Sequence, residues 1–347
     1  GNFGPAEFGG EDNALARACP NAHAAVLDSL ADHAPEGYEV GMECTHHGPS
    51  RVGVPSMFVE LGSGEDEWAD PDGARAVARA ILDLRGVAPH RERQLVGFGG
   101  GHYVPRFERV VRETDWAVGH VAADWCLESL GDPAKRRETV RQAFERSAAD
   151  HALVEGDHPE LTAVVEDLGY RVVSETWVRE TTGVPLDLAR DLEAAMTSVD
   201  DGLRFGDLAD ERRSFSVVDL PTELLEDASG VDHEWARTAV AGHALAYETT
   251  DGGSRVAGRA AVRDRDDYGR IVDELADVVA GKYDAVERAD GAVVAHETAF
   301  DPAKARKLGV PEGPAFGKLS NGQAVEVNGE TITPEAVHSE RTHRFPV

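Results

Sequence analysis

Short apolar runs alternate with amphipathic segments along the first half of the chain, and this alternation restricts the fold more than any other feature. Apolar residues at helical spacing predict helices over residues 21–33, 70–84 and 133–150. Short apolar runs predict buried strands over residues 38–44, 56–62, 94–98 and 116–121. Strands that alternate with helices pair mainly in parallel. We therefore expect an α/β fold with a mainly parallel, mixed sheet sandwiched by helices.

The alternation continues less regularly in the second half of the chain. Helices are predicted over residues 158–168, 185–197, 232–246 and 266–280, and strands over residues 170–178 and 255–262. Residues 283–299 are predicted to form paired strands around Asp290-Gly291. Because the chain has neither an internal repeat nor a low-complexity linker, the simplest prediction is a single domain over residues 1–347.

The charge of the chain is strongly negative. Its 64 Asp and Glu residues outnumber its 35 Lys and Arg residues, which gives a formal net charge of −29. The acidic residues are spread along the whole chain and lysine is scarce, which predicts a halophilic protein. The alternative is a specialised acidic interaction surface. In molar salt, counterion release contributes little to nucleic-acid binding, so any contacts with a nucleic acid must be local.

No apolar run approaches the length of a membrane-spanning helix, and no signal-peptide pattern opens the chain, so we expect a cytoplasmic protein. The cysteines Cys19, Cys44 and Cys126 are odd in number and lack a C-x-x-C pair. This pattern indicates neither a disulfide framework nor a thiolate zinc site, so we expect small core residues. The first residue is Gly1 rather than Met, and we expect that upstream sequence is missing.

Three clusters of polar residues follow predicted strands. The most distinctive is the stretch GFGGGHYVPR at residues 97–106, in which three glycines precede a histidine. Glycines lack Cβ and let the backbone approach a ligand, and open α/β sheets bind ligands beyond their strand ends. A glycine-rich structural turn is the alternative. The candidate side chains of the three clusters, together with a glutamate that closes a fourth strand, are Glu43, His46, His47, His102, Tyr103, Arg106, His120 and Glu60.

Histidine suits two roles at such a site, because its pKa near neutrality makes it a general base and neutral imidazole is a common zinc ligand. The sequence contains no H-E-x-x-H, no G-x-S-x-G, no P-loop and no complete G-x-G-x-x-G motif. The residues alone leave open whether each histidine is a ligand, a base or structural. The ten remaining histidines, His23 among them, are expected at the surface. The scattered tryptophans do not indicate an aromatic stacking platform.

Five motifs in matching order resemble the archaeal and plant family of D-aminoacyl-tRNA deacylases, the second type of this activity. They lie at residues 1–4 with 8–10, 43–49, 58–63 with 67–68, 97–107 and 119–120. The resemblance is dense over residues 1–122, and residues 309–337 resemble the tail of some members. It implies a hydrolase that cleaves the ester between a D-amino acid and the 3′ end of tRNA, releasing both. It also implies zinc dependence and a fold similar to that of bacterial peptidyl-tRNA hydrolase.

The same resemblance suggests roles for individual residues. The catalytic residues are expected to be His46, His47, His102 and Glu43, and the Zn²⁺ ligands His46, His102 and His120. The residues expected to bind substrate are Gly99, Gly100, Gly101, Tyr103 and Arg106, the last near the tRNA end. The expected partner is the 3′ end of D-aminoacyl-tRNA, rather than DNA or a membrane, and the expected state is a monomer.

The domain prediction also draws on the resemblance. Family members carry a further N-terminal portion, which we expect to be missing from the single α/β domain over residues 1–347. Residues 180–265 are longer than the family suggests and are expected to be an insertion, and residues 300–347 are expected to form a glycine-rich tail.

Two alternative functions stay open at this stage. One is a metal-independent esterase like peptidyl-tRNA hydrolase, in which a histidine base acts on an N-blocked substrate. The other is a non-catalytic nucleotide- or phosphate-binding module, in which the glycine run holds phosphate and the histidines only donate hydrogen bonds.

Overall fold

The computed structural model describes residues 1–211 and 214–347 of the chain. These residues form two compact units, unit 1 over Gly1–Gly183 and unit 2 over Val184–Val347. The sequence predicts one domain with an insertion that begins near residue 180, and the boundary between the units lies close to that position. That the two units work as one domain stays a prediction.

Unit 1 contains a four-stranded parallel sheet in the order β2-β1-β3-β4. Its strands are β1 (Gln94–Phe98), β2 (Ala117–Ala122), β3 (His151–Val154) and β4 (Arg171–Val173). Every residue of β1 is buried, as in a central parallel strand that has helices on both faces. The parallel sheet with its helices confirms the predicted α/β fold class.

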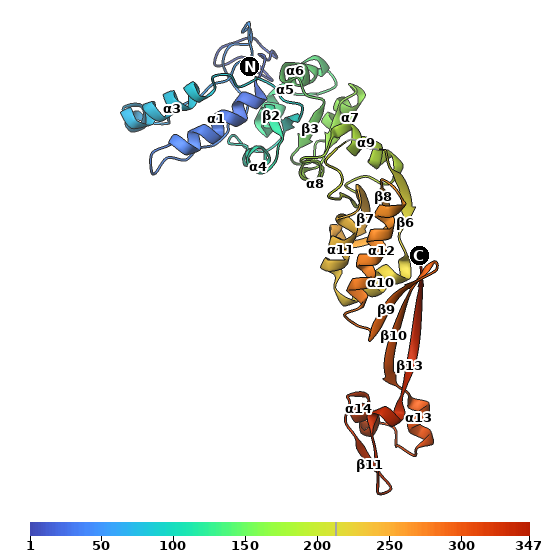
Figure 1. Cartoon of the computed structure of the whole chain (residues 1–347). Coiled ribbons are helices and arrows are strands. Elements are labelled where there is room, and N and C mark those ends of the chain that lie inside the picture. The colour runs from blue at the N-terminus through green and yellow to red at the C-terminus, as the bar shows by residue number, and fades with distance from the viewer. Residues whose placement is uncertain (212–213) are drawn as a thin grey trace. The chain divides into compact units, whose positions relative to one another are not determined.

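Helices connect these strands and cover the sheet. They are α1 (Pro20–His33), α2 (Glu65–Trp68), α3 (Pro71–Asp83), α4 (Pro105–Glu113), α5 (Asp124–Leu130), α6 (Arg137–Ser147), α7 (Pro159–Asp167) and α8 (Glu175–Glu180). The crossover through α4 runs from β1 to β2, whereas the crossover through α6 runs the other way, from β2 to β3. Because such crossovers are right-handed, α4 and α6 cover opposite faces of the sheet. Helix α7 contacts α6, and α3 lies beside α1 (Figure 1).

The glycine run leaves the sheet where the strand order reverses, between β1 and β3. Gly99 has a φ of +93°, and a Cβ atom there would lie 1.9 Å from the carbonyl oxygen of Glu155. The amide of Gly99 donates to the carbonyl of Ala122, and the amide of Asp124 donates to the carbonyl of Gly100. Gly100 has a φ of +81°, and a Cβ atom there would lie 2.6 Å from Oε2 of Glu155, so this path requires glycine at positions 99 and 100. The path leaves a strand end, where α/β sheets bind ligands.

Several predicted elements differ from the observed ones. Residues 38–44 and 56–62 form no strand, because their backbone makes isolated hydrogen bonds, such as Cys44 N–H to His102 O at 2.8 Å, rather than a ladder. The predicted strand at residues 170–178 is the short β4 followed by α8, which Ser174 caps by accepting a hydrogen bond from the amide of Trp177. Helices α4 and α5 and strand β3 were not predicted. The predicted helix starting at Asp70-Pro71 is confirmed, since the Asp70 side chain accepts from the amide of Asp72.

Unit 2 contains an antiparallel sheet in the order β5-β7-β8-β6, over which three mutually packed helices lie. Its elements are α9 (Leu186–Ala195), β5 (Leu203–Phe205), β6 (Ser216–Asp219), α10 (Thr222–Val231), α11 (His233–Ala241), β7 (Ala246–Thr250), β8 (Arg255–Val262) and α12 (Arg265–Val279). Buried apolar residues of these elements, such as Leu224, Val240 and Ile271, form a core that also includes Val293 and Phe345 farther along the chain.

The rest of unit 2 is built around a three-stranded antiparallel sheet in the order β13-β10-β9, with a separate two-stranded sheet of β11 and β12. The elements are β9 (Ala285–Ala289), β10 (Ala292–Phe300), α13 (Pro302–Lys307), α14 (Pro314–Ser320), β11 (Val325–Val327), β12 (Glu330–Ile332), α15 (Pro334–Val337) and β13 (His338–Pro346). The predicted hairpin around Asp290-Gly291 is confirmed. No helix in the described part of the chain has the length and apolar character needed to cross a bilayer.

Candidate functional site

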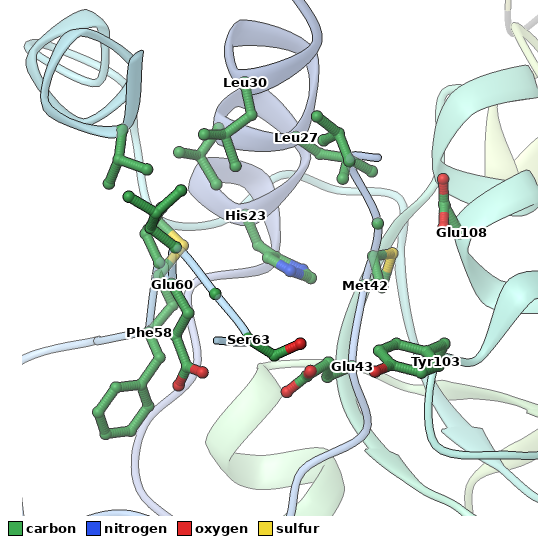
Figure 2. A pocket seen from close by; sticks show the side chains of 18 of the residues that line it. His23, Leu27, Leu30, Met42, Glu43, Phe58, Glu60, Ser63, Tyr103 and Glu108 are labelled. Atoms are coloured by element: carbon green, nitrogen blue, oxygen red, sulfur yellow. The ribbon is translucent and has the colours of Figure 1, made fainter. Parts of the chain in front are cut away.

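A cavity of about 1450 Å³ lies in unit 1, lined by α1, the extended segment 34–63, part of β2 and Tyr103. Figure 2 shows Phe58 and Glu60 on one wall, with Tyr103, Met42 and Glu108 on the opposite side. Glu43 and Ser63 lie between these walls (Figure 2). The residues of the histidine pair His46-His47 also line the cavity, so the polar clusters predicted from the sequence meet at one place.

Cys44, His46 and His102 form a group that could hold a metal ion. The Sγ atom of Cys44 lies 3.9 Å from Nδ1 of His46 and 3.9 Å from Nδ1 of His102. Nδ1 of His46 also lies 2.8 Å from the carbonyl oxygen of Cys44, to which it can donate. This hydrogen bond leaves Nε2 of His46 as the atom available to a metal, a common arrangement for histidine ligands.

A second metal-capable group shares His46 and adds Glu43 and His47. Nε2 of His102 lies 3.4 Å from Oε1 of Glu43, and Nε2 of His47 lies 3.6 Å from Oε1 of Glu60. Two imidazoles therefore face carboxylates at the edge of the cavity. Such pairing orients an imidazole, whether it binds a metal or accepts a proton.

The thiol of Cys44 is buried but easily ionised. A hydrogen bond from the Cys126 thiol is the main cause that lowers the pKa of Cys44 to about 7, while burial opposes the change. In the same pair the hydrogen bond with Cys44 and burial raise the pKa of Cys126. A thiol with a lowered pKa is the form suited to metal binding, because the thiolate is the ligand.

His120 lies apart from these groups. Its Nε2 is 2.8 Å from the carbonyl oxygen of Ala16 and its Nδ1 is 3.1 Å from Oγ1 of Thr45, so both ring nitrogens have protein partners. The side chain is buried, and desolvation lowers the pKa of His120 to about 4. The imidazole therefore stays neutral and holds Thr45 beside the Cys44–His46 segment.

The glycine run contributes backbone groups next to His102. The carbonyls of Gly100, Gly101 and His102 accept hydrogen bonds from Asp124, Val104 and Cys44. Within the described residues, the amides of Gly100 and Gly101 have no hydrogen-bond acceptor. Two adjacent N–H groups without a Cβ atom in the way are suited to bind an oxyanion.

Arg106 and Tyr103 have different environments. Nε of Arg106 lies 3.1 Å from Oε2 of Glu175, a carboxylate that also binds Arg109 and Arg179. Tyr103 is 65% exposed, and its ring contacts His102 with centroids 4.8 Å apart. The arginine is thus engaged within the protein, while the tyrosine ring is open to a ligand.

Comparison with known proteins gives one consistent answer. Residues 1–173 match the family model described as D-aminoacyl-tRNA deacylase. A D-aminoacyl-tRNA deacylase of Natronomonas pharaonis is 58% identical over 346 residues, which cover 99% of this chain and 78% of the relative. The chain belongs to the D-aminoacyl-tRNA deacylase family. The deacylase of Halobacterium salinarum is 56% identical, covering 100% of this chain and 77% of the relative, and that of Methanoregula boonei is 34% identical, covering 97% and 78%.

A solved structure is also similar to this deacylase family member. It is the crystal structure of a conserved protein of unknown function, with 32% identity, a TM-score of 0.47, and coverage of 52% of this chain and 66% of that one. The resemblance to D-aminoacyl-tRNA deacylases predicted from the motifs is confirmed by the family match. The halophilic character predicted from the acidic composition is likewise supported by the haloarchaeal relatives.

In this deacylase the structure brings together most of the predicted site residues. Glu43, His46, His47 and Glu60 line the cavity, and His102 contacts Glu43 and His46 beside it. His120 also lines the cavity, but neither metal-capable group of described residues includes it. Which of these residues act in catalysis or metal binding stays a prediction.

Sequence reasoning missed three features of the deacylase site. Cys44 was expected to be only a core residue, yet it lies between two histidines, and its position two residues before His46 was the available signal. His23 was expected at the surface but lines the cavity, where burial lowers its pKa. Trp125 lies with its ring centroid 6.0 Å from that of His46 and carried no sequence signal.

Proposed function

We propose that the chain hydrolyses the ester bond of D-aminoacyl-tRNA at the cavity of unit 1, releasing the D-amino acid and tRNA. The observation that carries this proposal is the meeting of Cys44, His46 and His102 at the strand ends of a deacylase-family sheet. We propose further that the chain acts as a monomer in the cytoplasm, where tRNA is charged, and that it acts on RNA rather than DNA, because the ester exists only on tRNA.

The donor set of Cys44, His46 and His102 fits zinc. Zinc bonds of about 2.3 Å to sulfur and about 2.0 Å to nitrogen place tetrahedral ligand atoms about 3.5 Å apart, close to the 3.9 Å between Sγ of Cys44 and Nδ1 of His102. Three protein ligands leave a fourth position open, as in catalytic zinc sites. A zinc ion held by these residues would supply a Lewis acid for the ester carbonyl and lower the pKa of water. His120 then takes a positioning role through Thr45 rather than that of a ligand.

The carboxylates beside the histidines suit proton transfer. Hydrolysis of an ester requires that a water lose a proton as it attacks the carbonyl carbon. The His47–Glu60 pair lies at the cavity edge. Nε2 of His47 faces Glu60, so Nδ1 can accept that proton while Glu60 stabilises the imidazolium through Nε2. Glu43 holds the His102 ring in place through its 3.4 Å contact. The proton returns to the ribose oxygen when the ester bond breaks.

The glycine run suits stabilisation of the tetrahedral oxyanion. The amides of Gly100 and Gly101 lie next to His102, and preorganised N–H donors at such a position stabilise the developing charge. Gly99 has a different role, because its amide is bound to Ala122 and its shape fits the loop against Glu155. Tyr103 faces the open side of the site, and we propose that it contacts the substrate. The ion pair with Glu175 offsets part of the positive charge of Arg106, so Arg106 contributes less positive charge to the site.

The test is deacylation of D-aminoacyl-tRNA and of its L counterpart in molar KCl by the same preparation. We expect release of the D-amino acid and much slower release of the L-amino acid. His102→Ala should abolish the reaction, and His233→Ala, a change of the same kind on α11 of unit 2, should leave it intact. Equal rates on both enantiomers would contradict the proposed function.

A further inference from the structure

Three exposed aromatic rings surround the histidines of the site. Tyr103 is 65%, Phe58 is 56% and Trp125 is 44% exposed. Each contacts a different histidine, with centroid separations of 4.8 Å for Tyr103–His102, 5.0 Å for Phe58–His47 and 6.0 Å for Trp125–His46. The three histidines also contact one another, His46–His47 at 4.2 Å and His46–His102 at 4.8 Å. The result is a continuous chain of rings that ends in exposed aromatic residues.

Large aromatic rings left open to solvent around a polar cluster mark a surface that binds something. These three come from separate segments, namely the extended segment before α2, the glycine loop and helix α5. They therefore carry no repeated spacing in the sequence, and only the fold brings them together. Phe58 also has a packing role, because a Cβ atom on Gly48 would lie 2.4 Å from its ring. Tyr103 and Trp125 are the rings that a ligand can use most freely.

We propose that Tyr103 and Trp125 stack against the unpaired bases at the 3′ end of the tRNA and so position the ester at the histidines. This inference rests on the proposed function. The ester is carried by the terminal ribose, so the terminal base must lie within one nucleotide of the reacting carbonyl. Rings in direct contact with His46 and His102 are at that distance from the site. Unpaired bases are recognised by stacking on aromatic side chains, which is sequence-tolerant.

The charge of the protein favours stacking over phosphate binding. The net charge is −29, and the arginines that follow the glycine run, Arg106 and Arg109, are both bound to Glu175. Concentrated salt removes most of the benefit of phosphate contacts, because that benefit comes from counterion release. Stacking of neutral rings on bases does not depend on counterion release. In concentrated salt, stacking on aromatic rings therefore contributes more to RNA binding by this acidic protein than phosphate contacts do.

The test measures direct binding of a fluorescently labelled RNA trinucleotide, CCA, to the full chain in molar KCl by anisotropy. We expect Tyr103→Ala and Trp125→Ala each to raise Kd by about tenfold or more, as loss of one stacked base predicts. Tyr103→Phe and Trp125→Phe keep a ring and should stay within about twofold of the unchanged chain. Trp235→Ala is the matched control, because Trp235 is 48% exposed but lies on α11 of unit 2.

Three outcomes would overturn the inference. The first is an unchanged Kd in both alanine variants, and the second is an equal loss of binding in the phenylalanine variants. The third is a changed preference among D-amino acids in deacylation by the alanine variants, with CCA binding intact. That result would mean that the rings contact the side chain of the amino acid instead of the bases. Because binding is measured without turnover, ring-dependent binding of CCA by a chain that fails to hydrolyse D-aminoacyl-tRNA would contradict the proposed function alone.

Discussion

The Sγ atom of Cys44 lies 3.9 Å from Nδ1 of His102, although the two residues are 58 positions apart in the sequence. The backbone fixes this contact, since the amide of Cys44 donates to the carbonyl of His102 at 2.8 Å. A buried thiol between two imidazoles, with a pKa of about 7, is poised to bind a metal as a thiolate.

Replacement of this thiol tests its role as a ligand. Cys44→Ala removes one of three proposed ligand atoms, so we expect the zinc content to fall well below one ion per chain. The deacylation rate should fall by about 100-fold or more. This loss is larger than the loss caused by replacing residues that only hydrogen-bond to metal ligands. Metal content by mass spectrometry and initial deacylation rates check both points. Cys19→Ala, which removes a different buried thiol at the start of α1, should keep the zinc content unchanged.

The His47–Glu60 pair should affect turnover rather than binding. Glu60→Gln keeps the size of the side chain but removes the charge that stabilises protonated His47. We expect kcat to fall by about tenfold to 100-fold while KM and zinc content stay the same. Glu39→Gln changes a carboxylate that lines the same cavity and, among the described residues, has no ion pair with a histidine. An equal fall of kcat in Glu39→Gln would mean that kcat depends on the total negative charge of the cavity rather than on the His47–Glu60 pair.

The glycine run should show two opposite responses to alanine. Gly99→Ala forces a Cβ atom to 1.9 Å from the Glu155 carbonyl oxygen in a left-handed conformation, so the free energy of unfolding should fall by about 3 kcal/mol or more. Gly101→Ala meets no atom within 4 Å, and its stability should change by about 0.5 kcal/mol at most. Denaturant titration in concentrated salt compares the two. Equal stability of both variants would contradict the observed loop.

Glu175 should contribute to stability in a pH-dependent way. Hydrogen bonds from Arg109, and then from Arg179 and Arg106, lower the pKa of Glu175 from 4.5 to about 2. A carboxyl with a lowered pKa in the folded state stabilises the protein above pH 4.5, and this contribution is lost as the pH falls from 4.5 to about 2.

The matching experiment follows the stability of Glu175→Gln between neutral pH and pH about 2. We expect the variant to be less stable at neutral pH and to lose less stability on acidification than the unchanged chain. Glu166→Gln, an exposed carboxyl on α7, should leave both quantities unchanged. Parallel acid unfolding curves for Glu175→Gln and the unchanged chain would show that the arginine cluster does not carry this stability.

The fold was predictable where hydrophobic patterns are local. Strand β1 occurs at the predicted residues, and helices α1, α3 and α12 begin within one residue of their predicted starts because Pro20, Asp70 and Asp264 mark them. The predicted strands at residues 38–44 and 56–62 were wrong, because apolar alternation does not reveal whether a neighbouring strand exists to form a ladder. The division at residue 183 rests on long-range contacts that a sequence pattern does not contain.

The site was predictable in its histidines and not in their surroundings. His102 stands out because the glycine run before it follows β1, and His46 and His47 stand out because Gly48-Pro49 ends the extended segment that holds them. Cys44 carried only one mark, its position two residues before His46, because a cysteine without a C-x-x-C partner otherwise resembles a core residue. His120 was predicted near a strand end, yet it lies within β2 and its ring points to Ala16 and Thr45. Side-chain direction at a strand end depends on packing, which the sequence does not show.

The most direct test of the zinc-dependent mechanism is the rate of D-aminoacyl-tRNA deacylation by the metal-free chain as zinc is added back. We predict negligible hydrolysis without metal and a rate that rises until about one zinc per chain is bound. Cys44→Ala should show no such rise. Hydrolysis by the metal-free chain at the full rate would contradict the account and favour a histidine base that works without a metal.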